Sequence, residues 1–181
     1  MIARCIALII ASSSLPAMAE DCRPVDASRG NVSFEVDQAG SPFRGAFRRF
    51  GGAICLTGDR VTRIDVWLDP SSVDAGLPEI DAALKGAEFF DVDRYPRAEY
   101  ASGSVEAAGN DQIARGTLQM KGVVHELDVP FRVQRQDGDF VVSGALTLNR
   151  LDYNIGTGEW SDTKWLGGGV KVSFTAVVGK K

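Results

Sequence analysis

The chain has 181 residues, of which 44% are hydrophobic and 24% charged, and its formal net charge at pH 7 is −4. It has no block of lysine and arginine, which nucleic-acid binding requires because cations must displace counterions from phosphates. One histidine and three cysteines are too few for most metal sites. We therefore expect one globular domain without a nucleic-acid partner and without a metal.

Residues 1–19 have the layout of a secretory signal peptide. Arg4 precedes a short apolar run at 5–11, and small residues at Ala17 and Ala19 provide a cleavage site. The apolar run is shorter than the roughly 20 residues of a membrane-spanning helix. A retained N-terminal anchor is the alternative. We expect cleavage after Ala19 and export, with residues 20–181 forming a single domain.

Two cysteines follow the predicted cleavage site, at Cys22 and Cys55. An even pair in an oxidising compartment predicts a disulfide, and two free thiols are the alternative. Such a bond would tie the segment before the first strand to the second strand. By constraining the unfolded chain it would stabilise the protein by about 3–4 kcal/mol.

From residue 31 onward, apolar and polar residues alternate with the period of two of a half-buried strand. The alternating runs lie at 32–36, 64–68, 98–106, 113–121, 127–133, 140–148 and 170–178. A run at 43–56 changes its apolar parity near Gly51 and Gly52, which predicts a bulge or sharp bend there. Pro130 must lie at a strand edge or an irregularity.

The segment 78–86 breaks the alternation. Pro78 suits a helix start, Ile80 and Leu84 are four residues apart, and Gly86 suits a helix stop. One short helix and seven or eight antiparallel strands, each with a single apolar face, predict an all-β fold that closes into a small barrel. Such a barrel either fills with side chains or holds one slender ligand, and periodicity leaves both open.

Catalytic constellations are scarce in this sequence. His125 is the only histidine, and its place between strands favours a solvated turn residue over a general base. A hydrolase or isomerase on the same barrel would need acids such as Glu88, Asp91 and Asp152 to converge in a pocket. A third hypothesis is an interaction module that presents the loop at 160–165 to a membrane protein.

The order of motifs along the chain resembles the YceI-like family. The similar stretches span nearly all of residues 30–178 and are Phe34-x-Val36, GAFRRFGG at 45–52, SSVDAG at 71–76, DAALKGAEFFD at 81–91, Tyr95-Pro96, GTLQMKG at 116–122 and NRLDYNIG at 149–156. This resemblance implies a lipocalin-like antiparallel barrel of about eight strands whose lumen holds an isoprenoid lipid, either a prenyl quinone or a polyprenyl chain.

The resemblance also implies a bacterial periplasmic carrier that is not an enzyme and needs no cofactor beyond its lipid. Similarity to the branch joined to cytochrome b-type membrane domains implies a membrane redox protein as partner.

Strand parity predicts which side chains face this lumen. The expected inward residues are Phe34, Val36, Phe47, Ile64, Val66, Leu68, Leu118, Met120, Phe131, Leu146, Leu148 and Phe174. The residues expected to cap or line one end are Phe89, Phe90, Tyr95, Tyr153 and Trp160. The helix at 79–86 is expected to act as a lid over that end.

Overall fold

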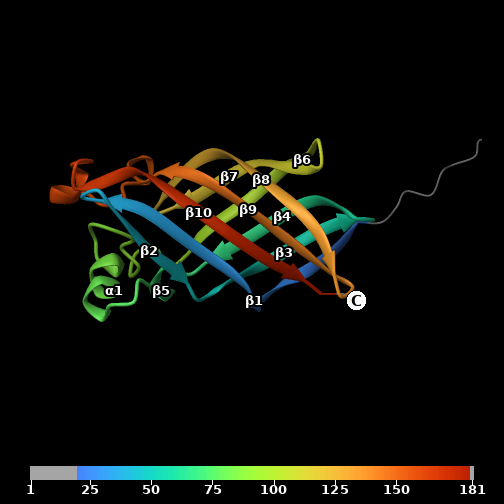
Figure 1. Ribbon diagram of the computed structural model, residues 1–181, viewed down its shortest axis with the longest axis horizontal. Coiled ribbons are helices and arrows are strands. Elements are labelled where there is room, and N and C mark those ends of the chain that lie inside the picture. Colours follow the sequence, from blue (N-terminus) through green and yellow to red (C-terminus); the bar gives the residue numbers. More distant parts are fainter. Residues whose placement is uncertain (1–19, 180–181) are drawn as a thin grey trace, which may run out of the picture.

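Residues 20–179 are described by a computed structural model and form a β-barrel with one α-helix (Figure 1). The predicted signal peptide at 1–19 lies outside the described residues. In chain order the strands are β1 (Asp21–Gln38), β2 (Ser41–Phe47), β3 (Phe50–Thr57), β4 (Arg60–Leu68), β5 (Val73–Asp74), β6 (Ala98–Ala108), β7 (Asp111–Met120), β8 (Val123–Gln136), β9 (Asp139–Asn149) and β10 (Leu166–Val178). The helices are α1 (Pro78–Lys85) and the 3₁₀ turns η1 (Pro70–Ser72), η2 (Arg150–Tyr153) and η3 (Gly158–Ser161).

Within the described residues the strands close into an antiparallel barrel of eight positions. The order is β10-β9-β8-β7-β6-β4-β3-β1-β2-β5, and pairing of β10 with β1 completes the ring. β2 and β3 share one position, because both pair with the long strand β1. β5 adds two residues at the edge of β2. The all-β prediction of a barrel of about eight strands with one short helix is therefore confirmed.

The first strand begins earlier than the alternation predicts, at Asp21 rather than near residue 31. Residues 21–24 pair with β3, and the rest of the strand pairs with β10 and β2. The ladder with β10 has an irregularity between Asp26 and Asn31. The apolar alternation is lost over this part of the strand, so periodicity does not reveal it.

The break in the 43–56 run lies at Arg48 and Arg49, not at the two glycines. Ser72 holds this corner: its carbonyl accepts from the Arg48 amide at 3.1 Å and its hydroxyl from the Arg49 amide at 2.9 Å. Gly52 is needed for another reason. Its φ is +129°, and a Cβ there would lie 2.2 Å from the carbonyl oxygen of Asp65 on β4.

Pro130 lies at an irregularity, as expected. β8 pairs with β7 up to Phe131 but with β9 only from Arg132 onward. Between the first half of β8 and the last residues of β9 there is consequently no ladder. The turn η2 lies at this gap, where His125 of β8 contacts the carbonyl oxygen of Asp152 through its Nε2 at 3.1 Å.

The predicted helix is present as α1. Pro78 occupies its first turn, Glu79 and Asp81 place negative charge there, and Lys85 lies in the last turn, which suits the helix dipole.

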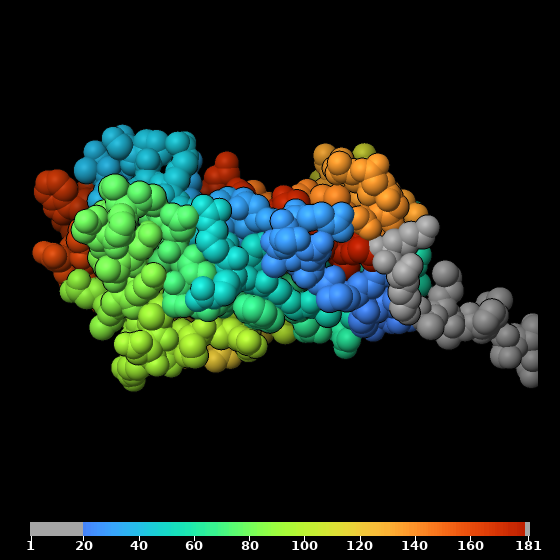
Figure 2. All heavy atoms as spheres, turned by 90° about the horizontal axis from the view of Figure 1, so that it is seen from below, coloured from blue at the N-terminus to red at the C-terminus, as the bar shows by residue number. Residues whose placement is uncertain are grey.

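We call the barrel end that carries α1, η2 and η3 the mouth, and the opposite end the floor (Figure 1). In Figure 2 the green residues that include α1 cover one side of the mouth, while the orange β8–β9 turn lies at the other end. No helix within residues 20–179 has the length and apolar character needed to cross a bilayer.

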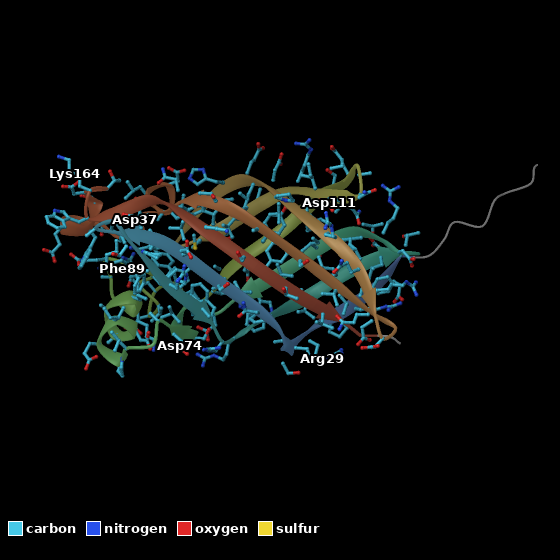
Figure 3. The ribbon with its side chains drawn as sticks, viewed as in Figure 1. Arg29, Asp37, Asp74, Phe89, Asp111 and Lys164 are labelled. Carbon is cyan, nitrogen blue, oxygen red and sulfur yellow. A yellow bond between two sulfur atoms is a disulfide. The ribbon has the colours of Figure 1, made fainter. Side chains whose placement is uncertain are left out.

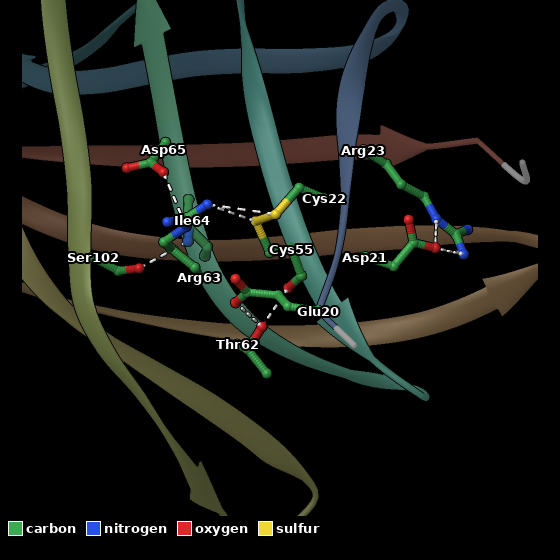
Figure 4. The surroundings of a disulfide bond; sticks show 10 residues. All are labelled: Glu20, Asp21, Cys22, Arg23, Cys55, Thr62, Arg63, Ile64, Asp65 and Ser102. Atoms are coloured by element: carbon green, nitrogen blue, oxygen red, sulfur yellow. Dashed lines mark hydrogen bonds and ion pairs between the residues drawn. A yellow bond between two sulfur atoms is a disulfide. The ribbon is translucent and has the colours of Figure 1, made fainter. Parts of the chain in front are cut away.

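The predicted disulfide between Cys22 and Cys55 is present and joins β1 to β3 (Figure 4). The Arg63 guanidinium lies 3.4 Å from the sulfur of Cys55 and 3.5 Å from that of Cys22. Glu20 lies beside the two sulfurs. The sulfurs are bonded to each other, so this group offers no thiolate to a metal.

Candidate ligand-binding site

The barrel encloses a cavity of about 330 Å³ between the mouth and the floor. This volume is at the lower end of the range for ligand pockets. Its lining is almost wholly apolar and comes from the inward rows of the barrel strands together with α1. Several inward side chains, such as Phe34, Leu146 and Phe174, remain partly accessible although they face the interior. The interior is therefore not filled by its own side chains.

Fourteen of the seventeen residues predicted to face or cap the lumen line this cavity. They are Phe34, Val36, Phe47, Ile64, Val66, Leu68, Phe89, Phe90, Leu118, Met120, Leu146, Leu148, Trp160 and Phe174. They lie there because inward residues of successive strands share one face of the closed sheet. That they contact a ligand remains a prediction.

Phe131, Tyr153 and Tyr95 do not line the cavity. Phe131 points inward but lies in the packed floor, where it is 2% exposed. Tyr153 is buried at the mouth with its ring edge-on to His125, 5.2 Å between centroids. Tyr95 packs over Gly122 in the β7–β8 turn. In each case the residue type is apolar or aromatic as expected, but Phe131 lies in the floor and the two tyrosines pack against other segments.

Sequence reasoning missed several lining residues, among them Phe43, Phe50, Trp67 and Tyr100. The corner at residues 48–49 disrupts the parity of β2 and β3, so Phe43 and Phe50 could not be assigned to a face. The parity of β4 places Trp67 on the outer face. In the structure its ring packs on Gly51 under the Arg97 guanidinium, 4.5 Å away, and still borders the cavity.

Arg150 is the only charged residue in the lining formed by residues 20–179, and it is 3% exposed. Its guanidinium donates to five backbone carbonyls at 2.6–2.9 Å: those of Ile155, Gly156, Trp160, Leu166 and Gly167. Burial lowers its pKa. The charge thus binds the mouth loops to the start of β10, and its donors are all used within the protein.

Gly156 shows how closely these loops fit around the arginine. Its φ is +74°, and a Cβ at this position would lie 2.4 Å from Nη1 of Arg150. The stretch NRLDYNIG at 149–156 contains both residues, but nothing in it shows what the arginine binds. The five carbonyls belong to backbone groups that only the folded loops bring together.

Tyr100 is another polar residue of the lining, in addition to Gln38 and Thr175. Its hydroxyl contacts the carbonyl oxygens of Ala114 at 3.0 Å and Leu127 at 3.2 Å. Burial, with a smaller contribution from Asp128, raises the pKa of Tyr100 to about 12. The hydroxyl is therefore neutral at physiological pH and its proton is engaged by the barrel wall.

α1 and the segment that follows it cover the mouth; we call them the lid, and that they open for a ligand remains a prediction. Ile80, Ala83 and Leu84 of α1 line the cavity, and Phe89 lies at the same end (Figure 3), with its ring 5.6 Å from that of Trp160. Lys121 fastens this lid from the other side of the mouth. Its Nζ donates to the carbonyl of Ala87 at 2.8 Å and to that of Asn154 at 2.7 Å, and burial lowers its pKa.

None of the residues that motivate the enzyme hypothesis lines the cavity: His125, Glu88 and Asp152 are exposed, and Asp91 is half-buried. Within the described residues, the convergence of acids and histidine that this hypothesis requires is therefore not found at the cavity.

The interaction hypothesis concerns the loop at 160–165, which borders an exposed surface at the mouth. A shallow hollow at the mouth is lined by Gln38, Ala39, Glu159, Trp160 and Trp165, and Trp165 is 64% exposed.

Comparisons with known proteins agree with this geometry. A family model of the YceI-like domain matches residues 24–178. Protein YceI of Salmonella arizonae is 28% identical over 137 residues, which cover 70% of this chain and 71% of the relative. BcnA of Burkholderia cenocepacia superposes with a TM-score of 0.82 at 28% identity, over 86% of this chain and 99% of BcnA. A domain from Saccharophagus degradans described as polyisoprenoid-binding has a TM-score of 0.71 at 19% identity, over 91% of this chain and all of that domain.

Proposed function

The chain belongs to the YceI-like domain family, and from this premise we propose that it binds one isoprenoid lipid, a prenyl quinone or a polyprenyl chain, in the barrel lumen. It acts as a carrier and not as a catalyst. The name of the related domain from Saccharophagus degradans, which describes that domain as polyisoprenoid-binding, is in keeping with this proposal. The observation that carries the proposal is the unfilled apolar cavity behind the lid.

The chemistry of the lining selects for a hydrocarbon chain. The donors of Arg150 and the hydroxyl of Tyr100 are already bonded to the protein, so a ligand finds few polar partners inside. Each methylene transferred from water into such a site contributes about 0.8 kcal/mol. Loss of translational freedom and ordering of the chain reduce this gross gain. A linear run of prenyl units offers the apolar area needed to exceed that cost.

Export supports the same role. The signal-peptide pattern of residues 1–19 and the disulfide both suit an oxidising compartment outside the cytoplasm. We place the mature protein, from Glu20, in the periplasm, where a water-insoluble lipid needs a carrier between membranes.

A membrane redox protein of the cytochrome b type is a second candidate partner. The exposed side chains of Trp165 at 64% and Leu77 at 58%, both near the mouth, favour it. Their position would bring the open end of the cavity to a membrane-bound acceptor. Such docking would complement lipid binding and not replace it.

Mass spectrometry of organic extracts from the purified protein tests the proposal, followed by titration with a prenyl quinone. Leu146→Trp places an indole in the lumen, and Thr147→Trp, on the outer face of the same strand, is the matched control. We expect one lipid per wild-type chain, the same for Thr147→Trp, and at least about a tenfold weaker affinity for Leu146→Trp. Absence of lipid uptake by the wild type, or unchanged affinity in Leu146→Trp, would refute it.

A further inference from the structure

The inward rows of the barrel strands continue past the cavity and end in a packed layer. On β8 the row runs from Leu127 and Val129, which line the cavity, to Phe131, which does not. On the other strands, too, the inward row ends in buried residues that do not line the cavity. The residues of this floor layer are Leu56, Val61, Ala114, Phe131, Phe140 and Val178, each at most 3% exposed. The cavity is therefore a blind tunnel with a solid end.

The floor layer is held by polar bonds as well as by packing. β6 pairs with β4 only through residues 98–101, so a gap opens between these strands toward the floor. The buried amide of Gln112 on β7 reaches across this gap and bonds both backbone groups of Val61 on β4, at 3.2 Å and 3.0 Å. Gln112 is directly opposite Phe131 in the β7–β8 ladder. The backbone beside Phe131 is thus fixed on both sides.

The two aromatic rings of the floor layer have different surroundings. Phe140 is covered by guanidinium groups, with Arg135 at 4.8 Å and Arg23 at 5.3 Å from its ring centroid. It seals the floor against solvent. Each ring lies one inward position beyond a lining residue, Phe131 beyond Val129 and Phe140 beyond Val142. Phe131 differs in having no guanidinium over its ring among the contacts described for residues 20–179. Of the two floor rings, Phe131 is therefore the one that we expect a ligand in the lumen to contact.

We propose that Phe131 is a chain-length stop: the terminal isoprene unit of the bound lipid rests against its ring, and this contact sets how many units the barrel holds. The inference rests on the proposed lipid binding and adds the residue that makes it selective. Units beyond the limit stay outside the mouth in water and contribute no further affinity. Removing the six ring carbons of Phe131 opens space for about one more five-carbon unit.

The test uses the full mature protein and a series of benzoquinones that differ only in the number of prenyl units. Dissociation constants are measured by quenching of tryptophan fluorescence, since Trp160 and Trp67 border the cavity. For the wild type, affinity should rise with each unit and then level off at a limiting length. Phe131→Ala should move this limit up by about one unit and bind that longer homologue about tenfold tighter than the wild type does.

Val129→Phe keeps Phe131 and adds a second ring one inward position nearer the mouth, so it should lower the limit by about one unit. Phe131→Leu is a milder variant that folds if the alanine variant does not, and it should shift the limit in the same direction as Phe131→Ala. The matched control is Tyr153→Ala, which removes another buried ring outside the lining and should weaken all homologues equally.

The outcomes separate the two proposals. A wild type that binds none of the quinones refutes lipid binding itself. A wild type whose affinity rises without a limit, or limits that are identical in the wild type, Phe131→Leu and Val129→Phe, refute the chain-length stop while lipid binding stands.

Discussion

Arg150 should be the residue whose replacement most weakens the mouth of the barrel. The substitution Arg150→Met keeps an apolar stem but removes the charge and the bonds to five carbonyls. Each hydrogen bond from a charged donor contributes about 1.5–3 kcal/mol, but the variant no longer has to bury a cation, which offsets part of the loss. We expect the free energy of unfolding to fall by about 3–5 kcal/mol, a large part of the about 5–15 kcal/mol typical of a domain.

Urea unfolding followed by far-UV circular dichroism measures this change. Arg150→Lys should lie between wild type and Arg150→Met, because one ammonium with three donors cannot reach five carbonyls. Arg44→Met is the control. Its guanidinium is 67% exposed and pairs with Glu35 at the surface, so its loss should cost under about 1 kcal/mol.

Hydrogen exchange locates the effect of Arg150→Met. Amides of residues 154–167 should exchange faster, because their carbonyl anchors are lost, while amides around the floor layer keep their protection. A loss of stability below about 1 kcal/mol, or full stability in Arg150→Lys, would show that the buried guanidinium does not hold the loops together.

Three further predictions concern the disulfide, the cavity wall and the lid. Cys22 and Cys55 are 33 residues apart, and replacing both by serine should lower the free energy of unfolding by about 3–4 kcal/mol in urea titrations. An unchanged urea midpoint would show that the disulfide does not stabilise the protein. Because the pKa of Tyr100 rises from 10.0 to about 12 on folding, the folded state keeps a proton that the unfolded chain loses above pH 10. Stability should then be full below pH 10 and fall by about 1–2 kcal/mol toward pH 12, a slope that Tyr100→Phe should flatten in pH-dependent urea midpoints. Lys121→Met removes both lid bonds and should speed transfer of bound lipid to vesicles about fivefold, whereas Lys171→Met on the exposed outer face of β10 should not. Equal transfer rates in the two variants would show that the Lys121 bonds do not hold the lid closed.

Much of the fold follows from local pattern. The period of two identifies the strands after residue 31, because an antiparallel sheet with one buried face must alternate. Pro78 and Gly86 mark the single helix within one residue of its observed ends. Where a strand lacks one apolar face, as in residues 21–30, the periodicity does not predict the strand. At the corner of Arg48 and Arg49 the chain passes from β2, which pairs with the second half of β1, to β3, which pairs with its first residues, and parity cannot be carried across.

Parity along the strands also predicts part of the candidate site. Parity states which side of the sheet a residue faces, and this suffices for Phe34, Leu118 and Leu146. It does not state the depth at which a residue lies along the barrel axis. Phe131 therefore has the right parity but belongs to the floor layer. Tyr153 has the right aromatic character but packs against His125 and does not line the lumen.

Taken alone, the order of residues predicts export, a disulfide, alternating strands with one short helix and an apolar inner face. Whether that inner face closes on itself or leaves a tunnel is decided only in three dimensions, because it depends on strand tilt and on the volumes of side chains that meet from distant strands. The same holds for Arg150. Its five acceptors are ordinary backbone carbonyls that carry no sequence signature, and folding alone gathers them around one buried charge.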